Sequence, residues 1–237
     1  MWLTAEYAPT ALYSLKLSTA TSSGGKTLLA PTPYALKMAL LDAAYRVRGS
    51  VAAEELWPAI RDLQVAFRPP SKAVVTNLFT KVLKPNRSAP APGSAHAGPL
   101  GKTIGYREYV HFAGPMGLAV SSPREDEPPD ALWLLLATVN YLGKRGGFLQ
   151  LVRAPAICED LPAGFVRLNE PSGQAAFVAR GLIQVMDDCA PSMTLEMANV
   201  YSGKRVRPGR DRLSYPVVLP YRLVRASKSY TLYERMD

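Results

Sequence analysis

The chain has 237 residues, which is long enough to bury a core as one large domain or two small ones. Its net charge is +9, and residues 201–237 hold nine Lys and Arg against three Asp and Glu, so this last segment carries +6 of the total. A local basic excess of this kind favours a polyanionic partner, nucleic acid before membrane. A solvated basic tail is the simpler alternative.

Cysteine, histidine and hydropathy patterns argue against several classes of protein. Cys158 and Cys189 stand alone without CxxC spacing, and the chain has only two histidines, so we expect no zinc or other metal site and no cofactor. The first residues lack the cationic start and apolar core of a signal peptide, and no apolar run reaches the roughly 18 residues that span a bilayer. We therefore expect a soluble cytoplasmic protein that makes no membrane contact.

Apolar periodicity predicts the elements of the N-terminal two thirds of the chain. In chain order we expect a strand at 11–18, helices at 31–48 and 51–62, a strand at 63–68, a helix at 71–83, strands at 106–112 and 118–120, a helix at 131–142 and a strand at 148–152. Taken coarsely, with extra elements and one loop inserted, the order is βαββαβ, which is the ferredoxin-like (RRM-like) module. The Pro-, Ala-, Gly- and Ser-rich residues 85–101 are predicted to be a mobile insertion.

The C-terminal third is predicted to be mostly β. Short strand-like runs occur at 165–168, 176–185, 215–224 and 229–233. The predicted fold class is therefore α+β, with a ferredoxin-like domain at 1–160 and a basic, mostly β subdomain at 161–237.

A phosphate-loop pattern suggests one candidate activity. Residues 20–27, Ala-Thr-Ser-Ser-Gly-Gly-Lys-Thr, fit a relaxed form of that pattern, and an apolar run further on ends in Asp187 and Asp188, which could hold magnesium. In a phosphate loop the Lys-Thr pair begins a helix at once, whereas here Pro33 falls where that helix needs an amide. A P-loop NTPase is therefore the second alternative function, and Lys26 is better explained as the cation of a flexible basic loop.

A glycine-rich turn, the glycine loop, follows the apolar helix at 131–142. It consists of Gly143, Lys144, Arg145, Gly146 and Gly147. Glycines allow backbone amides to approach a phosphate closely, and the two cations bring charge to the same place. The loop is therefore a candidate phosphate contact, with an ordinary surface turn between two buried elements as the alternative.

Three stretches carry a resemblance to a known family: the helix entry 31–41, Pro-Thr-Pro-Tyr-Ala-Leu-Lys-Met-Ala-Leu-Leu; the turn 142–147, Leu-Gly-Lys-Arg-Gly-Gly; and the β segment that ends at 230–234, Tyr-Thr-Leu-Tyr-Glu. The helix entry is similar to the Thr-Pro-rich entry and Lys-containing apolar helix of Cas family five. The turn is similar to that family's Leu-Gly-Lys/Arg turn after the second helix. The β segment resembles its small C-terminal β-domain in character. On a ferredoxin-like module this combination resembles the RAMP superfamily of CRISPR-associated RNA-binding proteins.

The resemblance implies a subunit of a type I Cascade surveillance complex, active in antiviral defence, that holds the 5′ handle of the CRISPR RNA (crRNA). Its implied partners are this crRNA, the backbone and large subunits of the complex, and target DNA near the PAM-proximal end. One branch of the family cleaves precursor RNA with a Tyr, a Lys and a His, the Lys just before the His. Here Val110 precedes His111 and Ala95 precedes His96. We therefore expect binding without catalytic residues, with a metal-independent endoribonuclease as the first alternative.

A single-stranded handle is bound through cations, close backbone approach and stacking surfaces. Besides the glycine loop and Lys26, the RNA-binding candidates are the cations of the basic C-terminal loop, Lys204, Arg205, Arg207, Arg210 and Arg212. The candidates for base stacking are Tyr106, Tyr109 and Phe112, although about half of such an aromatic set is expected in the core.

Overall fold

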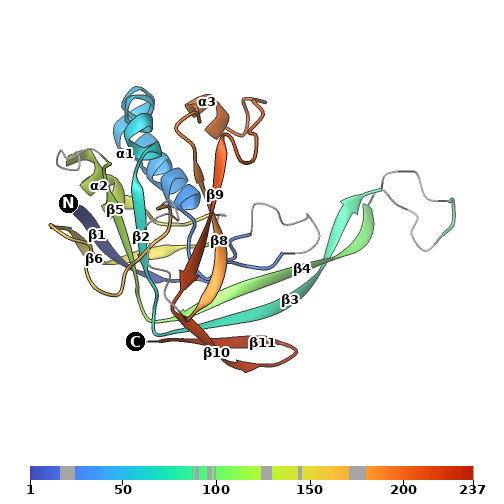
Figure 1. Ribbon diagram of the computed structural model, residues 1–237. Helices are drawn as coiled ribbons and strands as arrows, with labels where there is room; N and C mark the ends of the chain where they lie inside the picture. The colour runs from blue at the N-terminus through green and yellow to red at the C-terminus, as the bar shows by residue number, and fades with distance from the viewer. Residues whose placement is uncertain are drawn as a thin grey trace.

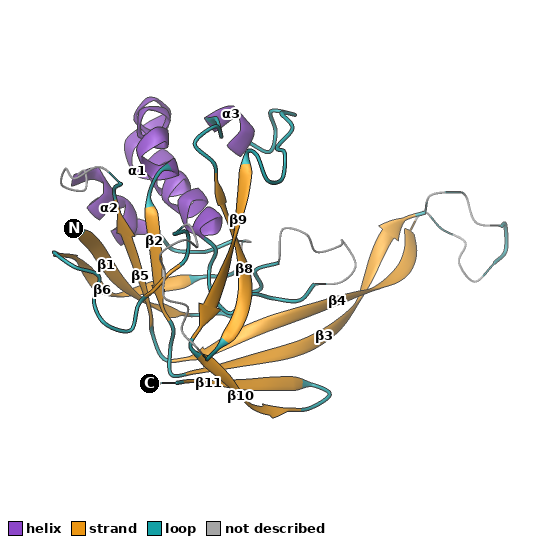
Figure 2. Ribbon diagram, in the orientation of Figure 1, coloured by secondary structure: helices purple, strands orange, loops and turns teal. Residues whose placement is uncertain are grey.

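The computed structural model describes residues 1–16, 25–86, 88, 91–94, 98, 100–123, 130–143, 146–170 and 180–236. Its central element is a five-stranded antiparallel sheet with two helices beside it (Figures 1 and 2). The elements are, in chain order, β1 (Trp2–Pro9), α1 (Pro33–Arg61), β2 (Gln64–Arg68), β5 (Met116–Ser121), α2 (Asp130–Thr138), β6 (Leu149–Cys158) and β7 (Val166–Arg167). The strands lie in the order β6-β1-β5-β2-β7. With β7 as an added edge strand, this arrangement confirms the predicted ferredoxin-like βαββαβ module.

The main core lies between this sheet and its two helices. Leu3 and Tyr7 of β1 are buried in it, and the Tyr7 hydroxyl donates a hydrogen bond to the carbonyl of Leu136 in α2. Because side chains alternate along a strand, Trp2 points to the opposite face, where Phe165 from the segment after β6 packs on the same small cluster. Both faces of the sheet are thus covered.

The helix α1 contains a break that the sequence predicts. Its N-cap is Thr32, whose hydroxyl accepts a hydrogen bond of 3.1 Å from the amide of Ala35. Gly49 has a φ of 79°, which lies outside the helical range, and the helix then continues to Arg61. The prediction of two helices separated at Gly49 is confirmed.

The predicted first strand at 11–18 is wrong, because the first strand of the sheet is β1. Residues 11–16 instead run beside β4 (Leu100–Ala113), where Tyr13 forms an isolated bridge with Val110, and residues 17 and 18 lie outside the described residues. Tyr13 and Leu15 are both buried. The alternation in this segment therefore reflects one buried side of an irregular segment rather than a continuous strand ladder.

The predicted helix at 71–83 is also wrong, because this segment is β3 (Lys72–Pro85). It pairs antiparallel with β4 along its whole length, from Lys72 opposite Ala113 to Pro85 opposite Leu100. The apolar residues here fit a helical stripe as well as a strand. The consecutive β-branched residues 74–76 are the feature that favours the strand.

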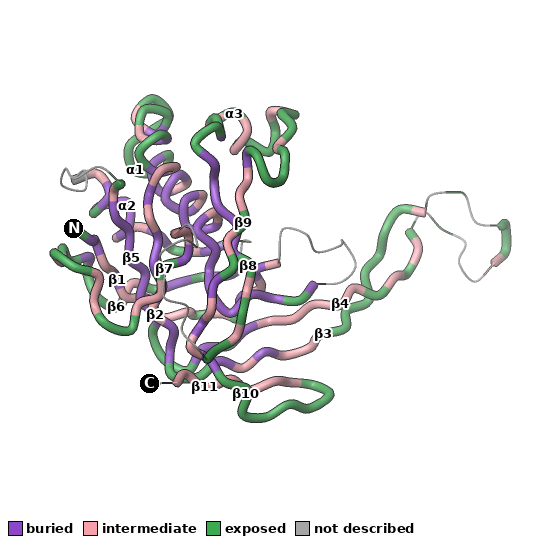
Figure 3. The backbone as a smooth tube through the Cα atoms, viewed as in Figure 1, coloured by how far each residue is buried: buried purple, intermediate pink, exposed green. Residues whose placement is uncertain are grey.

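The β3–β4 hairpin projects away from the rest of the molecule (Figures 1 and 3). Side chains near its base, such as Val75 and Val110, are buried, whereas those toward its tip, such as Phe79 with 69% exposure, are open to solvent. The predicted insertion at 85–101 joins the end of β3 to the start of β4 in the chain. Its mobility stays a prediction.

The C-terminal region is mostly β, as predicted. β8 (Leu182–Cys189) and β9 (Arg212–Leu219) form a two-stranded ladder with α3 (Leu195–Ala198) in the connection between them. β10 (Tyr221–Ala226) and β11 (Tyr230–Arg235) form a hairpin that pairs with β3, so the second sheet has the order β10-β11-β3-β4. The predicted strand 215–224 is thus two strands that meet at Pro220, and residues 176–179 of another predicted strand lie outside the described residues.

The predicted division of the chain at residue 160 stays a prediction. Strands from its two sides, β3 and β11, share a sheet. Within the described ranges, no helix is both long and apolar enough to cross a membrane.

Candidate nucleic-acid interface

The glycine loop connects α2 to β6 and has a defined backbone at both ends. Tyr141 and Phe148 form an antiparallel bridge, and the amide of Leu142 donates to the carbonyl of Gly147 at 3.0 Å. Gly143 has a φ of +71°, and a Cβ added there would lie 2.3 Å from the Cδ2 atom of Leu15. Only glycine satisfies both the backbone conformation and this close approach. Lys144 and Arg145 lie outside the described residues, so their role in binding phosphate stays a prediction.

Two cavities adjoin the glycine loop, one at each end. Gly143 lines the first, of about 280 Å³, together with Lys16, Tyr34 and Arg212. The second, of about 250 Å³, is lined by the other end of the loop and by two residues of β4; its walls include Ser14, Arg107, Tyr109, Gly146 and Gly147. The structure therefore brings Arg212 to one end of the predicted loop and Tyr109 to the other.

Two cations near the loop, Lys16 and Arg107, were not among the predicted binding residues. A Cβ added at Gly25 would lie 3.1 Å from Cε of Lys16 and 3.5 Å from Cδ and Nη1 of Arg107, so both side chains surround this glycine. One sequence signal could have found Arg107. It stands two residues before Tyr109 in a predicted strand, and this spacing places the two side chains on one face.

Arg212 reaches the first cavity as part of a cluster of charged and aromatic groups. Its guanidinium carbon lies 3.9 Å from the centre of the Tyr34 ring, and the same guanidinium forms an ion pair with Asp187. Stacking on an aromatic ring and pairing with a carboxylate both fix the orientation of an arginine. Arg212 is therefore a positioned group whose charge is offset in part by Asp187.

Lys26 lines a third cavity, of about 350 Å³, between the segment 26–29 and strands β3, β8 and β11. The next residue, Thr27, is held by protein groups: its amide donates to Oε2 of Glu108 at 2.8 Å, and its hydroxyl accepts from the amide of Leu15 at 3.1 Å. No helix begins here, because α1 starts at Pro33. Residues 20–24 of the phosphate-loop pattern lie outside the described residues.

The carboxylate that could have held magnesium in an NTPase is occupied by protein donors. Asp188 is buried and accepts hydrogen bonds from Lys37 Nζ at 2.8 Å, from Asn169 Nδ2 at 2.7 Å and from the amide of Cys189 at 2.7 Å. Its neighbour Asp187 is paired with Arg212. Nor do the described ranges contain a cluster of three or more His, Cys, Asp and Glu side chains that could hold a metal ion. The structure therefore gives the P-loop alternative no support.

The basic C-terminal loop lies between α3 and β9, beside α3 and away from β10 (Figure 1). Its four cations before Arg212 are exposed: Lys204, Arg205, Arg207 and Arg210. Arg207 Nε forms an ion pair of 2.8 Å with Asp211, and hydrogen bonds from Arg207 lower the pKa of that carboxyl to about 2. None of these four residues lines either cavity at the glycine loop. Of the predicted set, Arg212 is the residue that the structure places at the loop.

The three predicted stacking residues have different positions. Tyr109 lines the second cavity, and Tyr106 lies on the projecting hairpin with its ring centre 5.1 Å from that of the exposed Phe79. The prediction that Phe112 stacks on a base is wrong, because Phe112 is only 5% exposed and packs on Tyr13 in the core. It has no free face for a base. Phe79, which sequence reasoning missed, offers more accessible aromatic surface than any of the three predicted residues.

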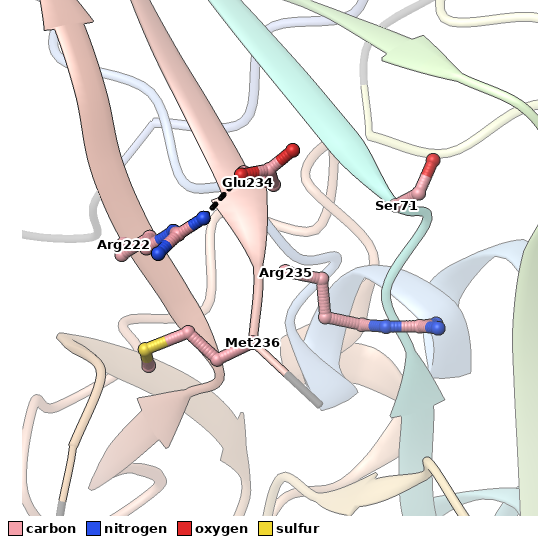
Figure 4. A pocket seen from close by; sticks show the side chains of 5 residues that line it. All are labelled: Ser71, Arg222, Glu234, Arg235 and Met236. Atoms are coloured by element: carbon pink, nitrogen blue, oxygen red, sulfur yellow. Dashed lines mark hydrogen bonds and ion pairs between the residues drawn. The ribbon is translucent and has the colours of Figure 1, made fainter.

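A larger hollow, of about 520 Å³, lies at the end of β11, and its lining residues are drawn in Figure 4. Its two arginines are already engaged. Arg222 pairs with Glu234 at 2.7 Å, and Arg235 donates to the carbonyl of Pro69 at 2.9 Å. This hollow is therefore a weaker candidate for an anion than the cavities at the glycine loop.

No protein-family model matches the chain. In sequence, it is 26% identical over 188 residues to the CRISPR-associated protein Cas5 of Archaeoglobus fulgidus, and the match spans 78% of each chain. The chain is therefore similar in sequence to a Cas5 protein over most of its length. A crystal structure of a CRISPR protein from Archaeoglobus fulgidus aligns with it at 11% identity and a TM-score of 0.48, over 100% of this chain and 92% of that one. A chain titled "CRISPR RNA-guided surveillance complex" aligns at 17% identity and a TM-score of 0.46, over 92% and 90%.

Proposed function

We propose that this Cas5-like chain is the RNA-binding subunit of a CRISPR type I Cascade surveillance complex and holds the 5′ handle of the crRNA. The sequence match to Cas5 over 78% of the chain carries the proposal. In that role its partners are the crRNA, the backbone and large subunits, and target DNA near the PAM-proximal end.

The charges around the glycine loop support this role. Lys16, Arg107 and Arg212 line the two cavities at the ends of the loop, and Lys144 and Arg145 add two charges within it. An ordinary surface turn would not require cations gathered from three distant parts of the chain. A nucleic-acid backbone does, since phosphate contacts supply most of its sequence-independent affinity.

Exposed aromatic surface suits single-stranded RNA in particular. Phe79 and Tyr106 form a tilted pair on the projecting hairpin, and Lys81 and Lys102 follow them toward the tip. Unstacked bases gain free energy on such rings whatever their sequence, and the neighbouring cations can follow the backbone.

The first experiment identifies the RNA and separates binding from cleavage. The protein is purified from cells that carry the CRISPR array and its other subunits, and the RNA that travels with it is sequenced. We expect short RNAs with one constant 5′ end. Incubation of the purified protein with repeat RNA in EDTA should leave the RNA intact, because we assign it no catalytic residues. Discrete products in EDTA would instead establish the endoribonuclease alternative.

The second experiment tests the glycine loop. Replacing Lys144 and Arg145 by Ala should weaken handle binding and lower the slope of log affinity against log salt by about 1.4, at roughly 0.7 for each phosphate of a single strand that the protein no longer neutralises. The matched control replaces two exposed cations, Arg225 near the end of β10 and Lys228 in the turn that follows. An equal slope in the two double variants would refute the assignment of the loop to phosphate.

A further inference from the structure

Two residues in the wall of the second cavity at the glycine loop each have a polar atom without a hydrogen-bond partner. Its volume is about 250 Å³, and its walls combine Ser14, Arg107 and Tyr109 with Gly146 and Gly147. Ser14 Oγ and Arg107 Nη1 are both buried atoms, and neither makes a hydrogen bond within the described part of the chain. Buried polar atoms are hydrogen-bonded in the great majority of cases, so two unsatisfied atoms in side chains of one cavity wall favour a ligand toward which those side chains turn.

The chemistry of the two groups identifies the class of ligand. A guanidinium has only donors, and a hydroxyl can donate as well, so the two atoms can be satisfied together by an oxygen-rich acceptor. Among the described residues that line this cavity none carries a carboxylate, whereas the first cavity contains Asp187. A positive charge without a counter-charge in that lining favours an anion, and arginine binds phosphate especially well.

The size and walls of the cavity favour one part of a polymer over a free small molecule. Pockets for whole small ligands usually occupy about 300–1,000 Å³, so 250 Å³ is below that range. The two glycines present no side chain, which permits close approach of a backbone. Tyr109 and Leu12 add aromatic and apolar surface to the same wall.

We propose that this cavity binds one phosphodiester of the RNA, with Arg107 and Ser14 donating to its oxygens and Tyr109 in contact with the attached ribose or base. The inference rests on the proposed RNA-binding function. It adds a defined subsite, made of residues from the segment before α1 and from β4, to the loop that joins α2 to β6.

Two substitutions test the subsite in different ways. Arg107→Gln should weaken the Kd for a single-stranded handle RNA roughly ten- to hundredfold and lower the salt slope by about 0.7, because one phosphate is no longer neutralised. Ser14→Ala should weaken it about three- to tenfold without changing the salt slope, since a neutral hydrogen bond is removed. The control is Arg225→Gln, which removes the same charge at an exposed position of β10.

Thermal unfolding separates ligand contact from a structural role. Ser14→Ala removes a buried hydroxyl that has no partner, so the free protein should be as stable as the wild type or more stable, while RNA binding weakens. A fall in stability that parallels the loss of affinity would overturn the proposal for Ser14.

The remaining outcomes decide the proposal as a whole. If wild-type protein binds the handle and both variants match Arg225→Gln, the subsite is refuted while the proposed function stands. If wild-type protein does not bind RNA, the subsite and the proposed function are both refuted. The last arm measures thermal unfolding with added inorganic phosphate. If phosphate stabilises the wild type but not Arg107→Gln, and that variant keeps its RNA affinity, the cavity is a site for free phosphate. Its assignment to RNA is then refuted.

Discussion

Replacement of Lys37 by Met should destabilise the protein strongly, although the same residue change on the surface is usually mild. Lys37 lies in the first half of α1 with 1% exposure. Its Nζ atom forms an ion pair with Asp188 at 2.7 Å and donates to the carbonyl of Arg61 at 2.6 Å. It therefore joins the two ends of the broken helix to β8 through a single buried charge.

The expected cost follows from these contacts. Removing one partner of a buried ion pair costs about 3–5 kcal/mol, because the other charge is left without compensation. Asp188 keeps its hydrogen bonds from Asn169 and from the amide of Cys189, which places the loss at the lower end of that range. The carbonyl of Arg61 loses a donor, which adds about 1 kcal/mol. We expect a total of about 3–4 kcal/mol in the free energy of unfolding.

Equilibrium unfolding in urea measures this loss, with Lys72→Met as the control. Lys72 is exposed and pairs with Glu234 at 3.7 Å, so its replacement should change the free energy of unfolding by less than about 1 kcal/mol. Adding Asp188→Asn to Lys37→Met removes the uncompensated charge. The double variant should therefore lose at least about 1 kcal/mol less free energy of unfolding than the sum of the two single variants. A loss below about 1 kcal/mol for Lys37→Met, or strictly additive effects, would refute the reasoning.

Two further predictions concern the candidate RNA-binding segments. Gly143→Ala should lower the free energy of unfolding by about 2–3 kcal/mol, and Gly203→Ala by only about 1–2 kcal/mol. Both glycines have a φ of 71°, but only at Gly143 would a Cβ lie 2.3 Å from Leu15. Equal losses in thermal unfolding would contradict the packing argument. The pKa of Asp211 is lowered to about 2 in the folded protein, mainly by hydrogen bonds from Arg207, so its stabilisation should be complete above about pH 4 and disappear as the pH falls toward 2. Asp211→Asn should therefore be less stable than the wild type at pH 7, and a difference that persisted at pH 2 would contradict this assignment.

The sequence was sufficient for the type of module but not for the position of every strand. Residues that must occupy special backbone conformations were predicted well: Gly49 ends the first part of α1, and Gly143 follows the buried helix. The apolar spacing of the segment 71–83 fits both the helical and the strand period, so the spacing alone cannot distinguish the two elements. The β-branched residues 74–76 favour the strand, and pairing with β4, which begins at Leu100, completes it.

The site was predicted in part for a similar reason. Gly143 of the predicted glycine loop and the predicted Arg212 line one cavity, but the second cavity includes Ser14 and Arg107, which are far apart in the chain. Neither belongs to a motif. A residue whose importance comes from a missing hydrogen-bond partner leaves no signature in the sequence, because the partner's absence is a property of the packed structure.

The pairing of β11 with β3 has a consequence for synthesis of the protein. β3 ends at Pro85 and β11 begins only at Tyr230, so β3 leaves the ribosome long before its partner. Until β11 arrives, the edge of β3 at residues 72–76 has unpaired amides and carbonyls. Open strand edges promote association between chains, and pairings between segments this distant in sequence form slowly. A protein truncated before β10 should therefore aggregate rather than yield an isolated ferredoxin-like domain, and a partner that covers this edge during translation would improve the yield of folded protein.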